Sequence, residues 1–502
     1  MKLTRILIAS LFLAPAVSPA VAELTADQVL ENRLSVYSTP GITVRAGGKR
    51  RSGNVLTVDR FLAEAELPDQ EGTLLVAVGG ASFAEREDGT VLMTYPPESP
   101  LTVQTLTSEG EEFTLVAKVR QSGARTVVSG TPDRIRYESA APSITIDDLR
   151  IVEPDMTDDL PIVASIKMVG YESNSDISGA AIGEFRGEDI LDSFQLHVDV
   201  NQNGDGESFS LRFEIADIAA QSSGTIAWQG LGNSLVATIL DGNTLDISAI
   251  LGHARYLLTG KGPDAEHFEI SSESSSSDVS VKMDRDGIDY RGSTHGAVLS
   301  VFASDMFDSL SEFRLPELSA RFLLPIVPEQ EPQDFAARFA VKGFEMNQEL
   351  WSMFDPAGVI DREPVTAVLD AGGKVIVLQD SLDGDFSEIL NLDHAPVDIR
   401  SLDLNEIWLK LAGVEVTGEG SFAFITRSDA PWPVGSANLA VTGVDKLLDG
   451  LVEIGIVQDL QALAFRGMVE ALARPDDGLD NFGLTIETGE DGSVVVNGQR
   501  IQ

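Results

Sequence analysis

The sequence predicts a mainly β protein with minor α content, in which hairpins build extended or curved antiparallel sheets. Three observations lead to this fold class. Apolar and polar residues alternate strictly over many short runs, turn-forming residues separate the runs, and helical periodicity is confined to a few segments. Such alternation is typical of strands with one apolar face. The 502-residue chain also contains no cysteine, so packing and not disulfides must stabilise it.

The chain begins with the pattern of a cleavable secretory signal peptide, residues 1–22. Lys2 and Arg5 supply a positive end, an apolar segment follows at 6–14, and Ala20-Val21-Ala22 matches a small-residue cleavage site. We expect the mature chain to begin at Glu23. The apolar segment is shorter than the roughly 20 residues that span a bilayer, and no later segment is long and apolar enough. The sequence therefore predicts an exported periplasmic protein without a transmembrane segment in the mature chain.

The charge of the chain is strongly acidic. It has 79 acidic and 36 basic residues, a net charge of −43. Because the signal peptide carries two basic residues and no acidic one, the mature chain carries −43 − 2 = −45. Coulomb repulsion then disfavours nucleic acid and anionic membrane surfaces as partners. The basic cluster Arg45, Lys49, Arg50 and Arg51 is the local exception. We interpret it as a solvated loop, with contact to a phosphate or neutralisation of nearby acids as alternatives.

Helices are expected at four places. Residues 25–37 form the first, where Thr25 and Gln28 have the spacing of a capping box. Residues 298–313 and 346–354 are further candidates. Apolar residues at helical spacing predict an αα-hairpin over 444–474, with Leu447, Leu448 and Leu451 on one face and Leu463, Met468 and Leu472 on another. We expect both stripes to pack on the terminal sheet, because a one-sided sheet must cover its apolar face.

The hairpins fall into two expected regions, 23–325 and 326–502. The clearest hairpin alternates over 195–200 and 208–215 around the polar turn 201–207. The segment 325–332 contains three prolines and two glutamates and is the expected linker between the regions.

The same polar turn is the candidate metal site. Asp199, Asn201, Asn203 and Asp205 are spaced like the first ligands of a calcium loop, with Gly204 at the position of the sharp turn. The match then ends, because Ser210 stands where a bidentate glutamate should close the loop. We therefore predict an ordinary hairpin turn and no metal site, with calcium binding as the alternative.

We find no motif for catalysis or cofactor binding. The histidines at 197, 253, 267, 295 and 394 show no zinc-type spacing, and the sequence has no nucleophile elbow, P-loop or dinucleotide fingerprint. The absence of cysteine excludes a cysteine nucleophile and a thiolate metal site. We expect a non-enzymatic protein without a cofactor.

Several short motifs in the C-terminal third resemble a family of alphaproteobacterial exported proteins of unknown function, domain of unknown function family 2125. They are Glu349-Leu350-Trp351, Asp355-Pro356, Val368-Leu369-Asp370, residues 399–406, residues 411–420, Ala473-Arg474-Pro475 and residues 496–501. The resemblance implies a periplasmic location and an alphaproteobacterial source, and it brings no catalytic residues. The hairpin pattern also resembles AsmA-like envelope proteins at the level of fold, in which curved sheets line a groove for lipid tails.

Three functional interpretations remain open. In the first, the chain is an envelope protein whose apolar sheet face binds lipid or an envelope partner. In the second, it is a structural or interaction protein with ordinary packed β cores. In the third, it is a hydrolase whose site has no recognisable motif. An open apolar trough would favour the first, since soluble monomers rarely expose one.

Overall fold

The computed structural model describes residues 24–38, 41–66, 72–107, 112–152, 162–179, 182–201, 207–227, 239–262, 266–304, 310–378, 397–427, 430–472 and 480–502. The predicted signal peptide, its cleavage site at Ala22 and Glu23, and Asn203 and Asp205 lie outside these residues. The chain divides into two compact units. Unit 1 comprises Met1–Ser271 with Ala303–Asp305, and unit 2 comprises Ser272–Phe302 with Met306–Gln502. The predicted fold class, antiparallel β with few helices, is confirmed.

Unit 1 is an antiparallel sheet with helix α2 preceding its first strand. Its elements are α2 (Ala26–Tyr37), β1 (Ile42–Gly47), β2 (Arg50–Ser52), β3 (Val55–Glu66), β4 (Gly72–Glu85), β5 (Val91–Thr94), β6 (Glu98–Thr107), β7 (Glu112–Ser122), β8 (Arg125–Thr131), β9 (Arg134–Val152), β10 (Ile162–Ser178), β11 (Ile182–Asn201), β12 (Ser208–Ala227), β13 (Thr244–Leu251), β14 (Ala254–Lys261) and the start of β15 (His267–Ser274). The long strands pair with different partners along their length, since β9 pairs first with β8 and then with β7. The two halves of such a strand therefore lie beside different partner strands.

Helix α2 covers one of these halves and forms the main core of unit 1. Its first turns bury Ala26, Val29 and Leu30, which share one face of the helix at spacings of three and four residues. They pack against the strand residues Leu56, Val58, Ala81, Phe83, Val91, Met93, Val128, Ile135, Tyr137, Ile177 and Phe185. Phe83 and Met93 are fully buried, so this half is an ordinary packed core.

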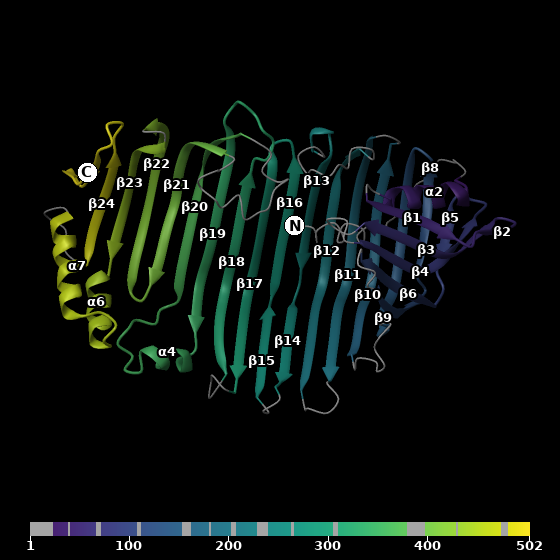
Figure 1. Ribbon diagram of the computed structural model, residues 1–502, viewed down its shortest axis with the longest axis horizontal. Helices are drawn as coiled ribbons and strands as arrows, with labels where there is room; N and C mark the ends of the chain where they lie inside the picture. Colours follow the sequence, from purple (N-terminus) through teal and green to yellow (C-terminus); the bar gives the residue numbers. More distant parts are fainter. Residues whose placement is uncertain are drawn as a thin grey trace. The chain divides into compact units, whose positions relative to one another are not determined.

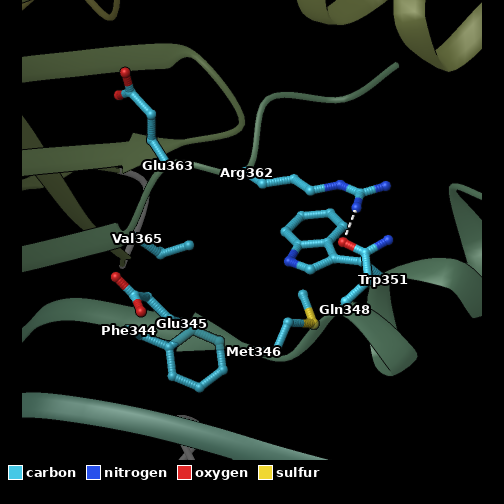
Figure 2. Close-up of a pocket in the computed structure, with 8 residues that line it drawn as sticks. All are labelled: Phe344, Glu345, Met346, Gln348, Trp351, Arg362, Glu363 and Val365. Atoms are coloured by element: carbon cyan, nitrogen blue, oxygen red, sulfur yellow. Dashed lines mark hydrogen bonds between the residues drawn. The ribbon is translucent and has the colours of Figure 1, made fainter. Parts of the chain in front are cut away.

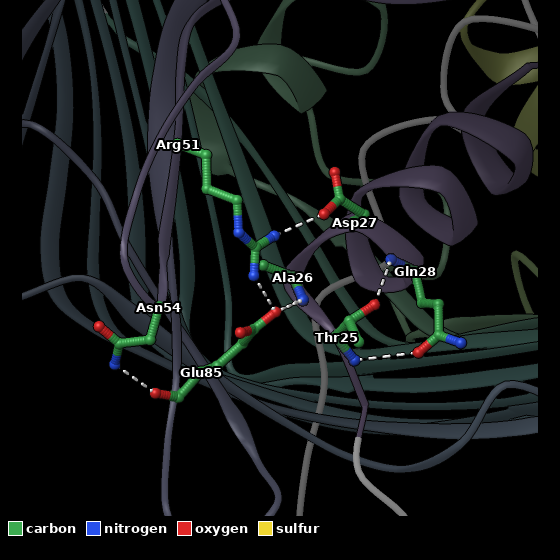
Figure 3. A network of polar contacts seen from close by, with 7 residues as sticks. All are labelled: Thr25, Ala26, Asp27, Gln28, Arg51, Asn54 and Glu85. Carbon is green, nitrogen blue, oxygen red and sulfur yellow. Dashed lines mark hydrogen bonds and ion pairs between the residues drawn. The ribbon is translucent and has the colours of Figure 1, made fainter.

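Polar contacts fix the start of α2, and they confirm the predicted capping box. Gln28 N donates to Thr25 Oγ1 at 3.3 Å, and Thr25 N donates to Gln28 Oε1 at 2.9 Å (Figure 3). Glu85 Oε1 accepts the Ala26 N–H at 2.8 Å and lies 2.7 Å from Arg51 Nη2. The Ala26 N–H and the Arg51 guanidinium together lower the pKa of Glu85. The start of the helix is thereby tied to β2 and β4.

Unit 2 is a meander in which each strand pairs with the next. Its elements are β16 (Ser276–Asp284), β17 (Gly287–Ala303), β18 (Ser311–Leu324), β19 (Gln333–Met346), α4 (Gln348–Phe354), β20 (Val365–Val377), β21 (Val397–Leu411), β22 (Val414–Arg427), β23 (Ala430–Thr442), α6 (Val444–Glu453), α7 (Asp459–Leu472), β24 (Asn481–Thr488), β25 (Val494–Val496) and β26 (Gln499–Arg500). All pairs from β16 to β26 are antiparallel (Figure 1).

Two expectations for this region differ from the structure. The helix predicted over 298–313 is wrong, because β17 continues to Ala303 and β18 begins at Ser311. Its apolar run has helical spacing, but pairing with neighbouring strands overrides this local pattern. The boundary expected at residue 325 also differs from the division near Ser271. The segment 325–332 connects β18 to β19, which pair with each other, and it buries Ile326 and Val327.

The αα-hairpin predicted at 444–474 is confirmed as α6 and α7, but one of its predicted faces is wrong. Ala462 and Val469 are the buried residues of α7. Val469 packs against Val441 and Phe482 of the sheet. The predicted stripe points elsewhere, since Leu463 is 66% and Met468 52% exposed.

This packing predicts effects of different size for two alanine substitutions in α7. Val469→Ala removes two buried methyl groups and should lower the free energy of unfolding by about 1–3 kcal/mol. Leu463→Ala removes an exposed side chain and should change it by less than about 0.5 kcal/mol. Urea unfolding monitored by circular dichroism measures both. A larger loss for Leu463→Ala would show that the predicted stripe, and not Val469, faces the sheet.

Candidate functional site: an open apolar face with a cavity at its end

One face of the unit 2 sheet is apolar across many strands. Residues that pair directly across an antiparallel sheet lie on the same face, so the register defines three cross-strand rows. They are Tyr290–Phe322–Ala337–Ala371–Leu404–Gly420, then Ala320–Phe339–Leu369–Ile407–Gly418–Leu439, and then Leu318–Val341–Ala367–Leu409–Val416–Val441–Phe482. We call this surface the apolar face. Apart from the Tyr290 hydroxyl, no side chain in the rows carries a hydrogen-bonding group.

Much of the apolar face is uncovered. Four large side chains of the rows, Phe322, Phe339, Leu369 and Leu409, are 37–49% exposed. Three more on the same side of these strands, beyond the rows, are 38–48% exposed, namely Leu324, Ile399 and Leu411. Coverage occurs where the third row ends, because Val441 and Phe482 are buried under Val469 of α7. The helical hairpin therefore covers the β23–β24 end of the face and leaves the side chains between β18 and β22 open.

An irregularity in β19 keeps the apolar residues on this face. The register shifts between Lys342 and Phe344, and Gly343 between them has a φ of +75°. Without the shift, the alternation would place Phe344 on the opposite face. A bulge with a left-handed glycine instead pairs Phe344 with Val365, next to Ala367 on the apolar face. The face thus continues to the end of the strands.

The opposite face of the same strands carries ion pairs between strands, next to a row that contains Ala340, Val368 and Trp408. Arg338 Nη1 lies 2.6 Å from Asp370 Oδ2 and 2.9 Å from Glu406 Oε2. Partial burial opposes ionisation of Asp370, but hydrogen bonds from Asn405 and Arg338 outweigh it and lower the pKa of this carboxyl. Lys342 pairs with Glu317 at 2.7 Å. Such exposed pairs add little stability.

A cluster formed by Asp355 and Arg362 holds Trp351 of α4 at the end of the apolar face. The buried carboxylate of Asp355 accepts the Val359 and Ile360 N–H groups at 2.9 and 3.1 Å and lies 3.2 Å from Arg362 Nη2. Desolvation opposes ionisation of Asp355, yet these donors keep its pKa below the usual value. The Arg362 guanidinium in turn stacks 5.4 Å above the Trp351 ring.

Beside this cluster lies a half-open cavity of about 270 Å³. Phe344, Met346, Val365 and Trp351 form its apolar walls, and Glu345, Gln348, Arg362 and Glu363 form its polar ones (Figure 2). Because Phe344 and Val365 belong to the apolar face, the cavity opens directly onto that face. Its volume is near the lower end of the roughly 300–1,000 Å³ of ligand pockets.

Those residues singled out from the sequence that the structure describes are not gathered into one site. Asp199 pairs with Ser210 in the β11–β12 ladder and lies 2.7 Å from His197 Nε2. Asn201 ends the ladder opposite Ser208. Among the described residues, no group of histidine, aspartate and glutamate side chains is arranged to hold a metal ion. The basic cluster neutralises neighbouring acids, through the pairs Arg45–Glu64, Arg50–Asp59, Arg51–Asp27 and Arg51–Glu85.

Sequence reasoning did not identify the cavity. Its apolar walls follow the alternation of β19 and β20, but Trp351, Glu345 and Arg362 carry no catalytic or metal-binding spacing. The available signal was the group of Trp351, Asp355 and Arg362 around a short predicted helix, which pairs a buried carboxylate with an arginine over an aromatic ring.

Comparison with known proteins adds no relative. No family model, no curated protein and no solved structure matches this chain. None of the helices in the described part of the chain has the length and apolar character needed to cross a membrane.

Unit 1 contains a carboxyl group with a shifted pKa between two of its long strands. Asp189 of β11 pairs with Ser173 of β10 and accepts hydrogen bonds from the Ser173 hydroxyl and, at 3.2 Å, from the Tyr171 hydroxyl. Burial raises the pKa of Asp189 to about 6, although both hydroxyl groups act to lower it. This aspartate therefore ionises close to neutral pH in the folded protein.

The shift predicts how stability depends on pH. Because the folded pKa lies above the usual 3.8, the stabilisation is fully present below about pH 4 and is lost as the pH rises through about 6. Asp189→Asn should remove this dependence and raise the free energy of unfolding at pH 7 by about 2–3 kcal/mol. Denaturant unfolding from pH 4 to 8 tests it, with the exposed Asp192→Asn as control. An unchanged pH profile for Asp189→Asn would contradict the assignment.

Proposed function

We propose that this chain is an exported, non-enzymatic protein of the periplasm that binds the acyl chains of lipids on the apolar face of unit 2. The observation that carries the proposal is the set of seven large apolar side chains, 37–49% exposed, on one face of a sheet whose other face is ion-paired. A sheet with one apolar face normally packs against another layer, and soluble monomers rarely expose large apolar patches.

The dimensions of the face suit an acyl chain. Neighbouring strands lie ~4.8 Å apart, so a row from β17 to β22 extends about 24 Å. The hydrocarbon core of a bilayer is about 30 Å thick and contains two leaflets, so the length of one acyl chain is about half of that thickness. A single row is therefore long enough to cover a chain along its whole length.

The chemistry of the face favours a lipid over a protein. Protein interfaces carry about one hydrogen bond per 100–200 Å², whereas the three rows offer one hydroxyl group, that of Tyr290. A second copy of this chain is disfavoured because each mature copy carries a net charge of −43 − 2 = −45, and like charges repel. An acyl chain needs no hydrogen bonds and brings no charge to the face.

Removing apolar side chains from the face tests this function. Replacing Phe339 and Leu369 together by serine should weaken binding of cis-parinaric acid, a fluorescent fatty acid, by about tenfold or more, since each contributes about 1 kcal/mol of apolar burial. The matched control replaces Leu460 and Leu463 of α7, which are 75% and 66% exposed, and should bind as the unmodified protein does. Equal affinity in all three proteins, or no binding by any, would refute the proposal.

Export is tested separately. Material isolated from the periplasm should begin at Glu23, since Ala20-Val21-Ala22 is the predicted cleavage site. The fold is compatible with this start, because the part of the chain that the structure describes begins directly after Glu23. Leu24 is buried, with only 3% of its surface exposed, and the Ala26 N–H donates to Glu85. N-terminal sequencing that found Met1 intact would contradict it.

A further inference from the structure

We propose that the β25–β26 hairpin closes the outer edge of the unit 2 sheet, and that a second copy of this chain would pair with β24 if the hairpin were absent. The inference does not depend on lipid binding. Strand β24 is the last long strand of the described meander, and an uncovered edge strand offers its N–H and C=O groups to any extended chain. The hairpin lies along this edge, since residues 494–496 pair with residues 486–488.

The sheet narrows step by step toward this edge. Strand β23 has 13 residues, β24 has 8, β25 has 3 and β26 has 2. Both residues of β26, Gln499 and Arg500, are exposed. Very short edge strands and charged side chains are common means by which soluble sheets avoid pairing with other chains. The outermost strand therefore offers almost no ladder to a partner.

Asn497 covers the part of β24 that β25 does not reach. Its backbone N–H donates to Thr485 O at 2.9 Å, and its side-chain Oδ1 accepts the Thr485 N–H at 2.8 Å. Its Nδ2 donates to Gly483 O at 2.8 Å. The N–H and C=O groups of one strand residue point to the same neighbour, so these groups of β24 point away from β23. The asparagine therefore takes the place of a neighbouring strand at Gly483 and Thr485.

The backbone of the turn explains why asparagine stands at this position. Asn497 has a φ of +48° and Gly498 a φ of +82°, and two successive left-handed residues form the type I′ turn that Asn-Gly favours in tight hairpins. Most other side chains avoid positive φ. Asn497 thus combines a backbone that reverses the chain with a side-chain amide that binds the edge of β24.

The hairpin also contacts the end of α7. Asn497 Nδ2 donates to Leu472 O at 2.9 Å, and Gln499 Nε2 donates to Ala471 O at 2.9 Å. The last carbonyl groups of a helix have no partner within the helix, so both side chains stabilise its end. The two residues differ because the Asn497 side chain also binds β24. Gln499 therefore provides a matched control for the role of the edge.

A second copy of this chain is the partner that the uncovered edge would fit. Two identical edge strands can pair antiparallel around a twofold axis, because each then offers the N–H and C=O groups that the other needs. Each mature copy carries a net charge of −43 − 2 = −45, so repulsion opposes such pairing. Salt screens this repulsion, since the Debye length falls to about 3 Å at 1 M. Self-association should therefore be stronger at high salt.

Light scattering after size-exclusion chromatography, at about 0.15 M and about 1 M salt, tests the proposal. The mature chain should remain a monomer at both. A variant that ends at Ser493 lacks the hairpin and should form dimers at high salt, with a dissociation constant at least about tenfold lower than that of the unmodified chain. Asn497→Ala should shift the equilibrium in the same direction, whereas Gln499→Ala should remain monomeric. Circular dichroism shows whether each variant keeps its β structure.

A proline in the edge strand makes the test specific. Thr485→Pro in the shortened chain removes an N–H group that donates to Asn497 in the intact protein, and edge strands tolerate proline. It should return the shortened chain to a monomer. Dimers that persist with Thr485→Pro, equal masses for the shortened and unmodified chains, or dimers of the unmodified chain would overturn the proposal. If the shortened chain does not fold, a monomeric Asn497→Ala variant would overturn it.

Discussion

The constraint on which unit 2 depends is the cross-strand register. Alternation has a period of two residues, so a slip by one residue would move every apolar side chain of a strand to the polar face. Directly paired residues such as Phe339 and Leu369 stay together because each ladder is fixed. The bulge at Gly343 illustrates the same constraint. It places Phe344 on the apolar face, whereas a regular strand would place this residue on the opposite face. The open surface and the cavity both depend on this register, because it determines which side chains lie on each face.

The sequence predicts the strands well because their signal is local. Runs such as Phe335 to Val341 show the alternation directly, and the ladders of β18 to β20 follow it. The capping box of Thr25 and Gln28 is equally local and equally correct. The error at 298–313 has a physical source. That run also has helical spacing, and pairing of β17 with β18 decides between the two patterns, which is information from a distant part of the chain.

The sequence predicts that the candidate site is an apolar sheet face, but it does not predict which part of that face is covered. One-sided strands predict an apolar face, but they do not say whether another layer covers it. The helix α7 illustrates the difficulty. Leu463 and Met468 of its predicted stripe are exposed, whereas Ala462 and Val469 are buried and Val469 packs against the sheet. The direction from which the helix approaches the sheet decides the contact here, and periodicity along the chain does not specify that direction. The cavity depends in addition on the contact of Arg362 with Trp351, which no spacing along the chain indicates.

The meander of unit 2 has a consequence for how this part of the molecule assembles and changes. From β16 to β26 each strand pairs with its neighbours in sequence, so the pairing partners are close along the chain. The tight turns, such as those between β16 and β17 and between β21 and β22, close at low entropic cost, and ordering can spread from one strand to the next, as in repeat proteins. The same geometry makes length adjustable. Adding or deleting one two-stranded hairpin preserves strand direction and sidedness, and it lengthens or shortens the open surface by about 10 Å.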